Sequence, residues 1–266
     1  REKKKTVHNI ALYPCKYIPE LPRWAIKKYS KEIDIILDPF IGGGTTFIEA
    51  LKLKRNCLGV DYNPYARLVS NVKSTPLNKD SFENKFKTLM NDIWEDNSPI
   101  SKPNFKGVEF WFNENVINGL SKIKKHIKLL NDEDLKNFFL VAFSMTVRKT
   151  SYIAPGQILT ARRKDWREIK QYTEKETIEM FDSFVREYSD YLFSFSKEIS
   201  TSNTTNIIGN DARELNIPSD IKEVDLIVAS PPYINAMDYI WANRLRIHWL
   251  DLVKDDEDRL NLYNFE

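Results

Sequence analysis

The chain has 266 residues, of which 42% are hydrophobic and 12% aromatic, so it can bury a core and is not globally disordered. Its 40 basic and 38 acidic residues leave a formal net charge of +2, and binding to nucleic acid would therefore need a local basic patch. The sequence has no apolar run of the ~18–20 residues that a membrane span needs, no secretory signal, and too few cysteines and histidines for a disulfide framework or a zinc site. We expect a cytoplasmic protein with no membrane attachment and no bound metal.

Four short runs rich in apolar and β-branched residues predict buried parallel strands, over residues 33–37, 57–60, 206–208 and 224–229. A glycine-rich turn and a helix over residues 45–54 follow the first run, and a helix over residues 64–73 follows the second. This alternation of strand, turn, helix and strand is typical of an open α/β sheet.

The character of the sequence changes between the second and third strands. Apolar residues recur there at helical spacing over residues 115–130, 132–149 and 174–200, with a polar loop over residues 151–165. We therefore predict a sheet domain formed by residues 1–76 and 205–266, interrupted by a mostly helical insert over residues 77–204.

The sharpest motif is the run DPFIGGGTT, which extends from Asp38 to Thr46 directly after the first strand. Its three glycines leave no side chain to obstruct a ligand, and the helix that follows presents unpaired N–H groups. Open α/β sheets bind ligands at this end of their strands. The turn lacks the glycine spacing of a pyrophosphate site, and Asp38 would repel phosphate, so the motif favours a ligand that carries an amino group.

Asp61 ends the second strand. An acid at this place can accept hydrogen bonds from both ribose hydroxyls of a nucleoside ligand. That chemistry suits a nicotinamide dinucleotide and S-adenosylmethionine equally well.

The motif SPPY, from Ser230 to Tyr233, follows the fourth strand. Its prolines cannot extend a central strand and give a stiff exit from the sheet. This arrangement fits methyl transfer to the exocyclic amine of a nucleobase, whose lone pair is delocalised into the ring. The Ser230 hydroxyl and the Pro231 carbonyl can accept hydrogen bonds from that amine, and Tyr233 can stack on an extruded base.

Taken together, DPFIGGGTT, Asp61 and SPPYINAMDY resemble the amino-methyltransferases of bacterial restriction–modification systems, which methylate cytosine N4 or adenine N6 in DNA. The resemblance implies a Rossmann-like methyltransferase sheet, S-adenosylmethionine as the cofactor, and direct methyl transfer to a flipped base in double-stranded DNA. A serine before PPY resembles the cytosine-N4 subgroup. The resemblance and the motifs give the expected cofactor contacts Tyr13, Lys16, Asp38, Phe40, Gly42, Gly44, Thr45, Asp61, Asn63 and Asp211. They also give the expected catalytic residues Ser230, Pro231, Pro232 and Tyr233.

The helical insert is the expected region of DNA contact and target recognition. Basic residues flank its polar loop and form the candidate DNA-binding set Arg148, Lys149, Arg162, Arg163 and Lys164. A cognate restriction endonuclease is a further expected partner in a bacterial or archaeal cytoplasm. The chain starts at Arg1 and offers few residues after SPPY, so we expect a missing C-terminal segment or a partner chain to complete the sheet.

Three other functions remain open from the sequence. The short C-terminal part is consistent with a catalytically silent or split methyltransferase-like DNA-binding subunit, although such a subunit has no chemical reason to keep both motifs. An RNA guanine-N2 methyltransferase shares a similar turn but has an aspartate where this chain has Ser230. A nicotinamide oxidoreductase fits the sequence less well than either of these two, because the glycine spacing is not that of a dinucleotide site and because SPPY has no role in that chemistry.

Overall fold

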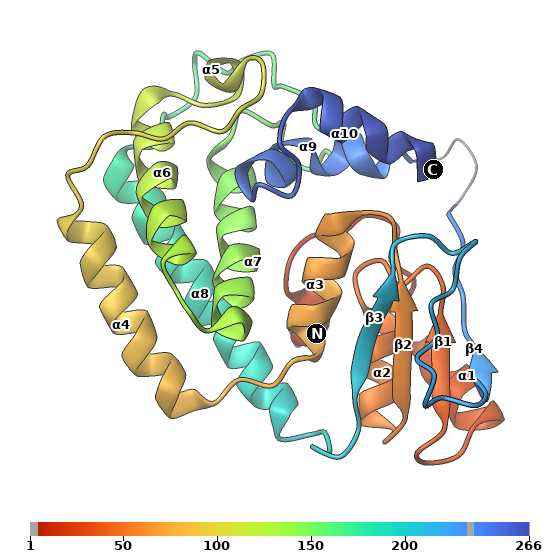
Figure 1. Cartoon of the computed structure of the whole chain (residues 1–266). Coiled ribbons are helices and arrows are strands. Elements are labelled where there is room, and N and C mark those ends of the chain that lie inside the picture. The colour runs from red at the N-terminus through yellow and green to blue at the C-terminus, as the bar shows by residue number, and fades with distance from the viewer. Residues whose placement is uncertain (1–4, 233–236, 266) are drawn as a thin grey trace. The chain divides into compact units, whose positions relative to one another are not determined.

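A computed structural model describes residues 5–232 and 237–265 of the chain (Figure 1). The chain forms two compact units. The first, here called the sheet unit, comprises Arg1–Pro76, Tyr191–Tyr239 and Asn264–Glu266. The second, the helical unit, comprises Leu77–Asp190 and Ile240–Tyr263. The predicted sheet domain comprised residues 1–76 and 205–266; the compact sheet unit also includes residues 191–204, and residues 240–263 belong to the helical unit. The expected roles of the two parts in catalysis and DNA contact remain predictions.

Within the described residues, the sheet unit is built on four parallel strands, β1 (Ile35–Asp38), β2 (Asn56–Val60), β3 (Thr205–Gly209) and β4 (Leu226–Ile227). Their order is β3-β2-β1-β4, and the four arrows of Figure 1 lie side by side in this order. Leu37 of β1 is in register with Leu58 of β2 on one side and with Ile227 of β4 on the other. The structure confirms the predicted α/β class with a parallel open sheet. β4 is shorter than the apolar run 224–229 suggested.

The described part of this unit also contains the helices α1 (Glu20–Tyr29), α2 (Thr45–Lys52) and α3 (Pro64–Ser74), preceded by a short 3₁₀ turn, η1 (Val7–Asn9). The apolar side chains of α1 and α2 pack against the sheet in one core. Its buried members include Ile26, Ile36, Phe47, Cys57 and Val228. This core fixes the start of α2, and with it the glycine turn that leads from β1 into the helix.

The helical unit contains α4 (Lys79–Glu95), α5 (Val108–Trp111), α6 (Glu114–Lys128), α7 (Glu133–Thr150), most of α8 (Glu174–Ser196) and of α9 (Tyr239–Trp249), and α10 (Asp256–Asn261). A 3₁₀ turn, η2 (Leu262–Phe265), ends the described chain. Phenylalanine rings fill the core of the unit, with Phe82 against Phe138 and Phe139 against Phe181. The helices predicted from apolar spacing are therefore present. None of the helices in the described residues is both long and apolar enough to cross a membrane.

Candidate functional site

A cavity of about 430 Å³ opens in the sheet unit where the strands end. Its walls come from the segments that follow all four strands, together with an N-terminal segment over residues 13–17. Most of the predicted site residues line it, namely Tyr13, Lys16, Phe40, Gly42, Thr45, Asp61, Asp211, Ser230 and Pro232. The topology thus brings the glycine turn, the acid after β2 and the SPPY segment to one place, although they are far apart in the sequence.

Four other predicted residues do not line this cavity: Asp38, Gly44, Asn63 and Pro231. The side chain of Asn63 instead caps the start of α3, accepting a hydrogen bond from the backbone N–H of Tyr65 at 3.0 Å. Tyr233 lies outside the described residues.

Asp38 is completely buried behind the glycine turn. Its carboxylate accepts hydrogen bonds from the hydroxyls of Thr46 and Tyr17 and, at 3.0 Å, from the backbone N–H of Phe40. Burial raises the pKa of Asp38 to about 6, against the opposing effect of these donors. The Asp38 carboxylate therefore faces the turn and the start of α2. Asp38 can contribute to ligand binding only indirectly, by fixing the conformation of the turn.

The glycine turn depends on backbone conformations and close approaches that other residues do not tolerate. Gly42 and Gly44 have positive φ angles of 50° and 79°. A Cβ atom on Gly44 would lie 2.8 Å from the Cα atom of Ser70 on α3. Gly44 thus lets α3 approach the turn, and its role is packing.

Asp61 is held in place by the backbone on both sides. Its Oδ2 accepts a hydrogen bond from the N–H of Gly42 at 2.8 Å, and its Oδ1 accepts one from the N–H of Asn63 at 2.9 Å. Only 8% of the residue is exposed, and burial raises its pKa to about 6. Each carboxylate oxygen keeps a lone pair for a second donor, which is the geometry that a pair of ribose hydroxyls requires.

Asp211 follows β3 and lines the cavity, as expected, but its carboxylate already has a partner. Arg213 donates from Nε at 2.9 Å and from Nη2 at 2.7 Å, and these hydrogen bonds lower the pKa of Asp211 to about 2. Asp211 therefore stays ionised at neutral pH. The two residues form a paired unit at the mouth of the cavity.

Tyr13 forms an aromatic wall of the cavity. Its ring stacks on Tyr239 at 6.1 Å and on Tyr65 at 6.5 Å between centroids, and its Cβ would lie 3.2 Å from a Cβ added to Gly43. The absence of a side chain at Gly43 thus makes room for Tyr13. Tyr65 and Tyr239 could not be identified from the sequence, because only the fold brings these rings together.

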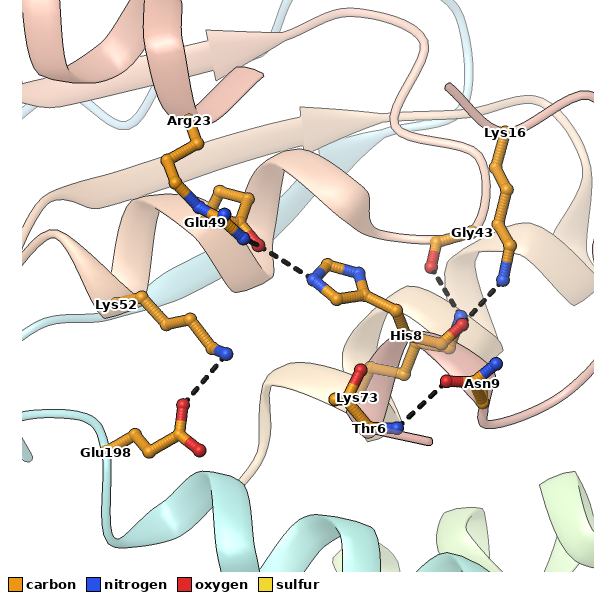
Figure 2. Close-up of polar contacts among 10 residues, drawn as sticks. All are labelled: Thr6, His8, Asn9, Lys16, Arg23, Gly43, Glu49, Lys52, Lys73 and Glu198. Atoms are coloured by element: carbon orange, nitrogen blue, oxygen red, sulfur yellow. Dashed lines mark hydrogen bonds and ion pairs between the residues drawn. The ribbon is translucent and has the colours of Figure 1, made fainter. Parts of the chain in front are cut away.

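Lys73 supports the turn from α3, and the sequence analysis missed it. The residue is 1% exposed, and its Nζ donates a hydrogen bond to the carbonyl of Gly43 at 3.0 Å (Figure 2). Burial and the charge of Lys16 lower the pKa of Lys73 well below its usual value. A signal existed in the sequence, since Lys73 lies four residues after buried Val69 and so shares the buried face of its helix.

The N-terminal segment is tied to α2 through a buried acid, Glu49, which the sequence analysis also missed. Glu49 accepts a hydrogen bond from Nε2 of His8 at 2.7 Å and from Nε of Arg23 at 2.6 Å. Lys16 adds a hydrogen bond from its Nζ to the carbonyl of His8 at 2.5 Å. Figure 2 shows His8 and Arg23 meeting the same carboxylate. These contacts fix the segment that carries Tyr13 and Lys16 into the cavity wall.

The candidate DNA-binding residues all lie in the helical unit. Arg148 and Lys149 end α7, and Arg162, Arg163 and Lys164 lie on the loop that follows it. Arg148 donates a hydrogen bond to the carbonyl of Gln157 on that loop. Arg163 is paired with Asp165 through two hydrogen bonds of 2.7 Å.

Comparison with known proteins agrees with the geometry of the sheet unit. Residues 1–72 match a family described as DNA methylase. The chain is 31% identical to Type II methyltransferase M.MvaI of Kocuria varians and 23% identical to Type II methyltransferase M.MjaII of Methanocaldococcus jannaschii, and 97% of the chain aligns in each case. It covers 60% and 64% of these proteins, about three fifths of their length. No solved structure is significantly similar to the chain.

Type II DNA methyltransferases, such as these relatives, use S-adenosylmethionine. The cavity lining includes the carboxylates of Asp61 and Asp211, the glycine turn with the first residue of α2, and the aromatic rings of Tyr13 and Tyr239. The sequence matches, the parallel sheet and the glycine turn together relate this chain to the DNA amino-methyltransferases of restriction–modification systems.

Proposed function

We propose that the protein is a DNA methyltransferase that moves a methyl group from S-adenosylmethionine to an exocyclic amine of a base, with cytosine N4 favoured over adenine N6. One observation carries the proposal: the cavity gathers the glycine turn, Asp61 and the Ser230–Pro232 segment at one end of the sheet. The serine before the two prolines supports cytosine.

Different residues of the cavity bind different parts of the cofactor. Asp61 holds the ribose hydroxyls, since its two oxygens are already oriented by backbone N–H groups. Phe40 and the segment after β3 flank the adenine, and Tyr13, Lys16 and the start of α2 at Thr45 face the methionine end. S-adenosylmethionine supplies an electrophilic methyl group when it is bound there.

The SPPY segment holds the target base. The Ser230 hydroxyl and the Pro231 carbonyl accept hydrogen bonds from the exocyclic amine, which shifts electron density toward its nitrogen and prepares it for direct attack. The base reaches this position by flipping out of the duplex, because the amine is otherwise stacked and paired. No covalent enzyme intermediate is required.

The helical unit and a further strand complete the enzyme. The basic residues of the helical unit contact the DNA backbone. A further segment or a partner chain pairs with the outer edge of β4, where Ile227 is 60% exposed and where no strand pairs in the described part of the chain. The protein acts in the cytoplasm, beside a cognate restriction endonuclease.

The test is methyl transfer from labelled S-adenosylmethionine to duplex DNA of mixed sequence, followed by digestion to nucleosides. Label in N4-methylcytosine is expected. Label in N6-methyladenine would keep the enzyme class and overturn the choice of base. Ser230→Ala should abolish transfer and leave cofactor affinity unchanged, with Ser200→Ala as the matched control; loss of cofactor affinity in Ser230→Ala would instead give this serine a structural role.

A further inference from the structure

The loop over residues 151–165 has a defined conformation in the helical unit. Ile153 and Arg162 form an antiparallel bridge, and the N–H of Arg163 donates to the carbonyl of Tyr152 at 3.0 Å. Thr160 ties the loop to α9, because its hydroxyl donates to the carbonyl of Trp241 at 2.7 Å and its own carbonyl accepts from the indole N–H of Trp241 at 3.0 Å. The loop therefore presents Arg162 in a fixed place.

The guanidinium of Arg162 lies against two aromatic rings. Its Cζ is 3.9 Å from the ring centroid of Phe110 and 3.7 Å from that of Trp166. Such contacts engage the flat faces of a guanidinium and leave its in-plane N–H groups to an acceptor. Arg162 forms no ion pair within the described part of the chain, and its buried Nε has no hydrogen-bond partner there.

Arg162 borders a shallow groove of the helical unit. The groove is lined by three cationic side chains, those of Lys106, Arg162 and Arg244, and by the aromatic rings of Phe110, Trp111 and Trp241. Nearby Asp256 accepts hydrogen bonds from Arg244 at 3.3 Å and from the backbone N–H of Lys106 at 3.0 Å. The described residues that line the groove include three cations and no acid, so the groove keeps an excess of positive charge beside apolar ring surface.

We propose that this groove binds a backbone phosphate of DNA, with the guanidinium of Arg162 as its central donor and the aromatic rings against the neighbouring deoxyribose. The proposal rests on the proposed function for its choice of polyanion. A planar guanidinium already held by stacking loses little conformational freedom when a phosphate binds it with two hydrogen bonds. Cationic side chains without acidic partners are also those that release counterions on binding DNA.

The experiment measures the affinity of the whole chain for fluorescent DNA duplexes of two unrelated sequences over a range of salt concentrations. Arg162→Gln should weaken binding to both duplexes equally, by about tenfold at low salt, and should reduce the slope of log affinity against log salt by about one. Arg162→Lys should recover part of the affinity. Arg186→Gln is the matched control, because it removes the same charge from an arginine of α8 that is paired with Asp182, and it should bind as the unaltered chain does.

Lys106→Gln keeps the test decisive if Arg162 variants fold poorly, since this side chain is exposed and its removal should also lower the salt dependence. Unchanged DNA affinity in folded Arg162→Gln and Lys106→Gln would overturn the proposal. A loss confined to one of the two duplexes would also overturn it, because it would mean that Arg162 reads a base. DNA affinity is measured without methyl transfer, so this inference can fail while the proposed activity stands, and the activity can fail while this inference stands.

Discussion

The backbone N–H of Gly42 donates a hydrogen bond to Oδ2 of Asp61 at 2.8 Å, and this contact joins the turn after β1 to the acid after β2. The two residues follow neighbouring parallel strands, β1 and β2, so the contact is a consequence of the sheet order. It orients the carboxylate toward the cavity and fixes the turn in the same step.

Cofactor affinity should depend on pH through Asp61, whose pKa burial raises to about 6. A protonated carboxyl accepts hydrogen bonds more weakly, so affinity for S-adenosylmethionine should fall as the pH drops below about 6, by up to tenfold per pH unit. Equilibrium binding across that range checks the effect. In Asp61→Asn the affinity should be lower and nearly independent of pH over this range; a wild-type affinity that is also flat would count against ribose binding by Asp61.

The raised pKa of Asp61 makes the stability of the fold change with pH in the direction opposite to cofactor affinity. The folded pKa of Asp61 lies above its ordinary value of 3.8, so its contribution to stability is present at low pH and is lost as the pH rises through about 6. Wild-type stability should therefore decrease relative to Asp61→Asn between about pH 4 and pH 7, by up to about 3 kcal/mol. Denaturant unfolding of both proteins at several pH values measures the difference.

Cys15 should report on occupancy of the cavity. The chain has two cysteines, of which Cys15 is exposed and lines the cavity, whereas Cys57 is buried in the sheet core. Burial raises the pKa of Cys57 well above its usual value, so its thiol should stay unreactive in the folded protein. A maleimide should label Cys15, and S-adenosylmethionine should slow that labelling. Equal labelling rates with and without S-adenosylmethionine would mean that the ligand binds outside this cavity.

Gly44 and Gly156 have similar positive φ angles, but only Gly44 lies close to another helix, α3. Comparing their alanine variants therefore distinguishes the cost of a steric clash with α3 from the cost of backbone strain. Gly44 has φ +79° and would place a Cβ 2.8 Å from Ser70, whereas Gly156 has φ +74° and open space around it. Gly156→Ala should cost about 1–2 kcal/mol of stability, the cost of a left-handed residue. Gly44→Ala should cost clearly more, because α3 must move away from the turn. Equal values in denaturant unfolding would remove the packing role of Gly44.

The link between His8 and Glu49 should affect the cavity from a distance. Glu49 is completely buried and accepts hydrogen bonds from His8 and Arg23, so Glu49→Leu should break both contacts, leave the largely buried His8 without its acceptor and destabilise the fold by about 1–3 kcal/mol. Affinity for S-adenosylmethionine should fall too, because the segment with Tyr13 loses its attachment. Asp182→Asn, which alters an exposed pair on α8, should change neither quantity. Reduced stability with full affinity would limit Glu49 to a structural role.

The sequence predicted what depends on local pattern. Apolar spacing placed α6 and α7 within about two residues of their observed ends, and the β-branched runs located all four strands. What it could not predict depends on contacts between distant segments. Asp38 turns away from the cavity because Tyr17 and Thr46 supply its donors, and Lys73 reaches Gly43 only after α3 has packed on the turn. The stacking of Arg162 on Phe110 needs the loop and α5 to meet.

Equilibrium binding of S-adenosylmethionine shows whether the cavity at the strand ends of the sheet unit holds this ligand. We expect saturable binding of one molecule of S-adenosylmethionine per chain at neutral pH. Asp61→Ala should weaken it by roughly 1–3 kcal/mol through the loss of charged hydrogen bonds, while Asp34→Ala, an acid outside the cavity lining, should not. Absence of binding would mean that the cavity does not hold S-adenosylmethionine, and equal affinity in wild type and Asp61→Ala would mean that Asp61 does not bind it.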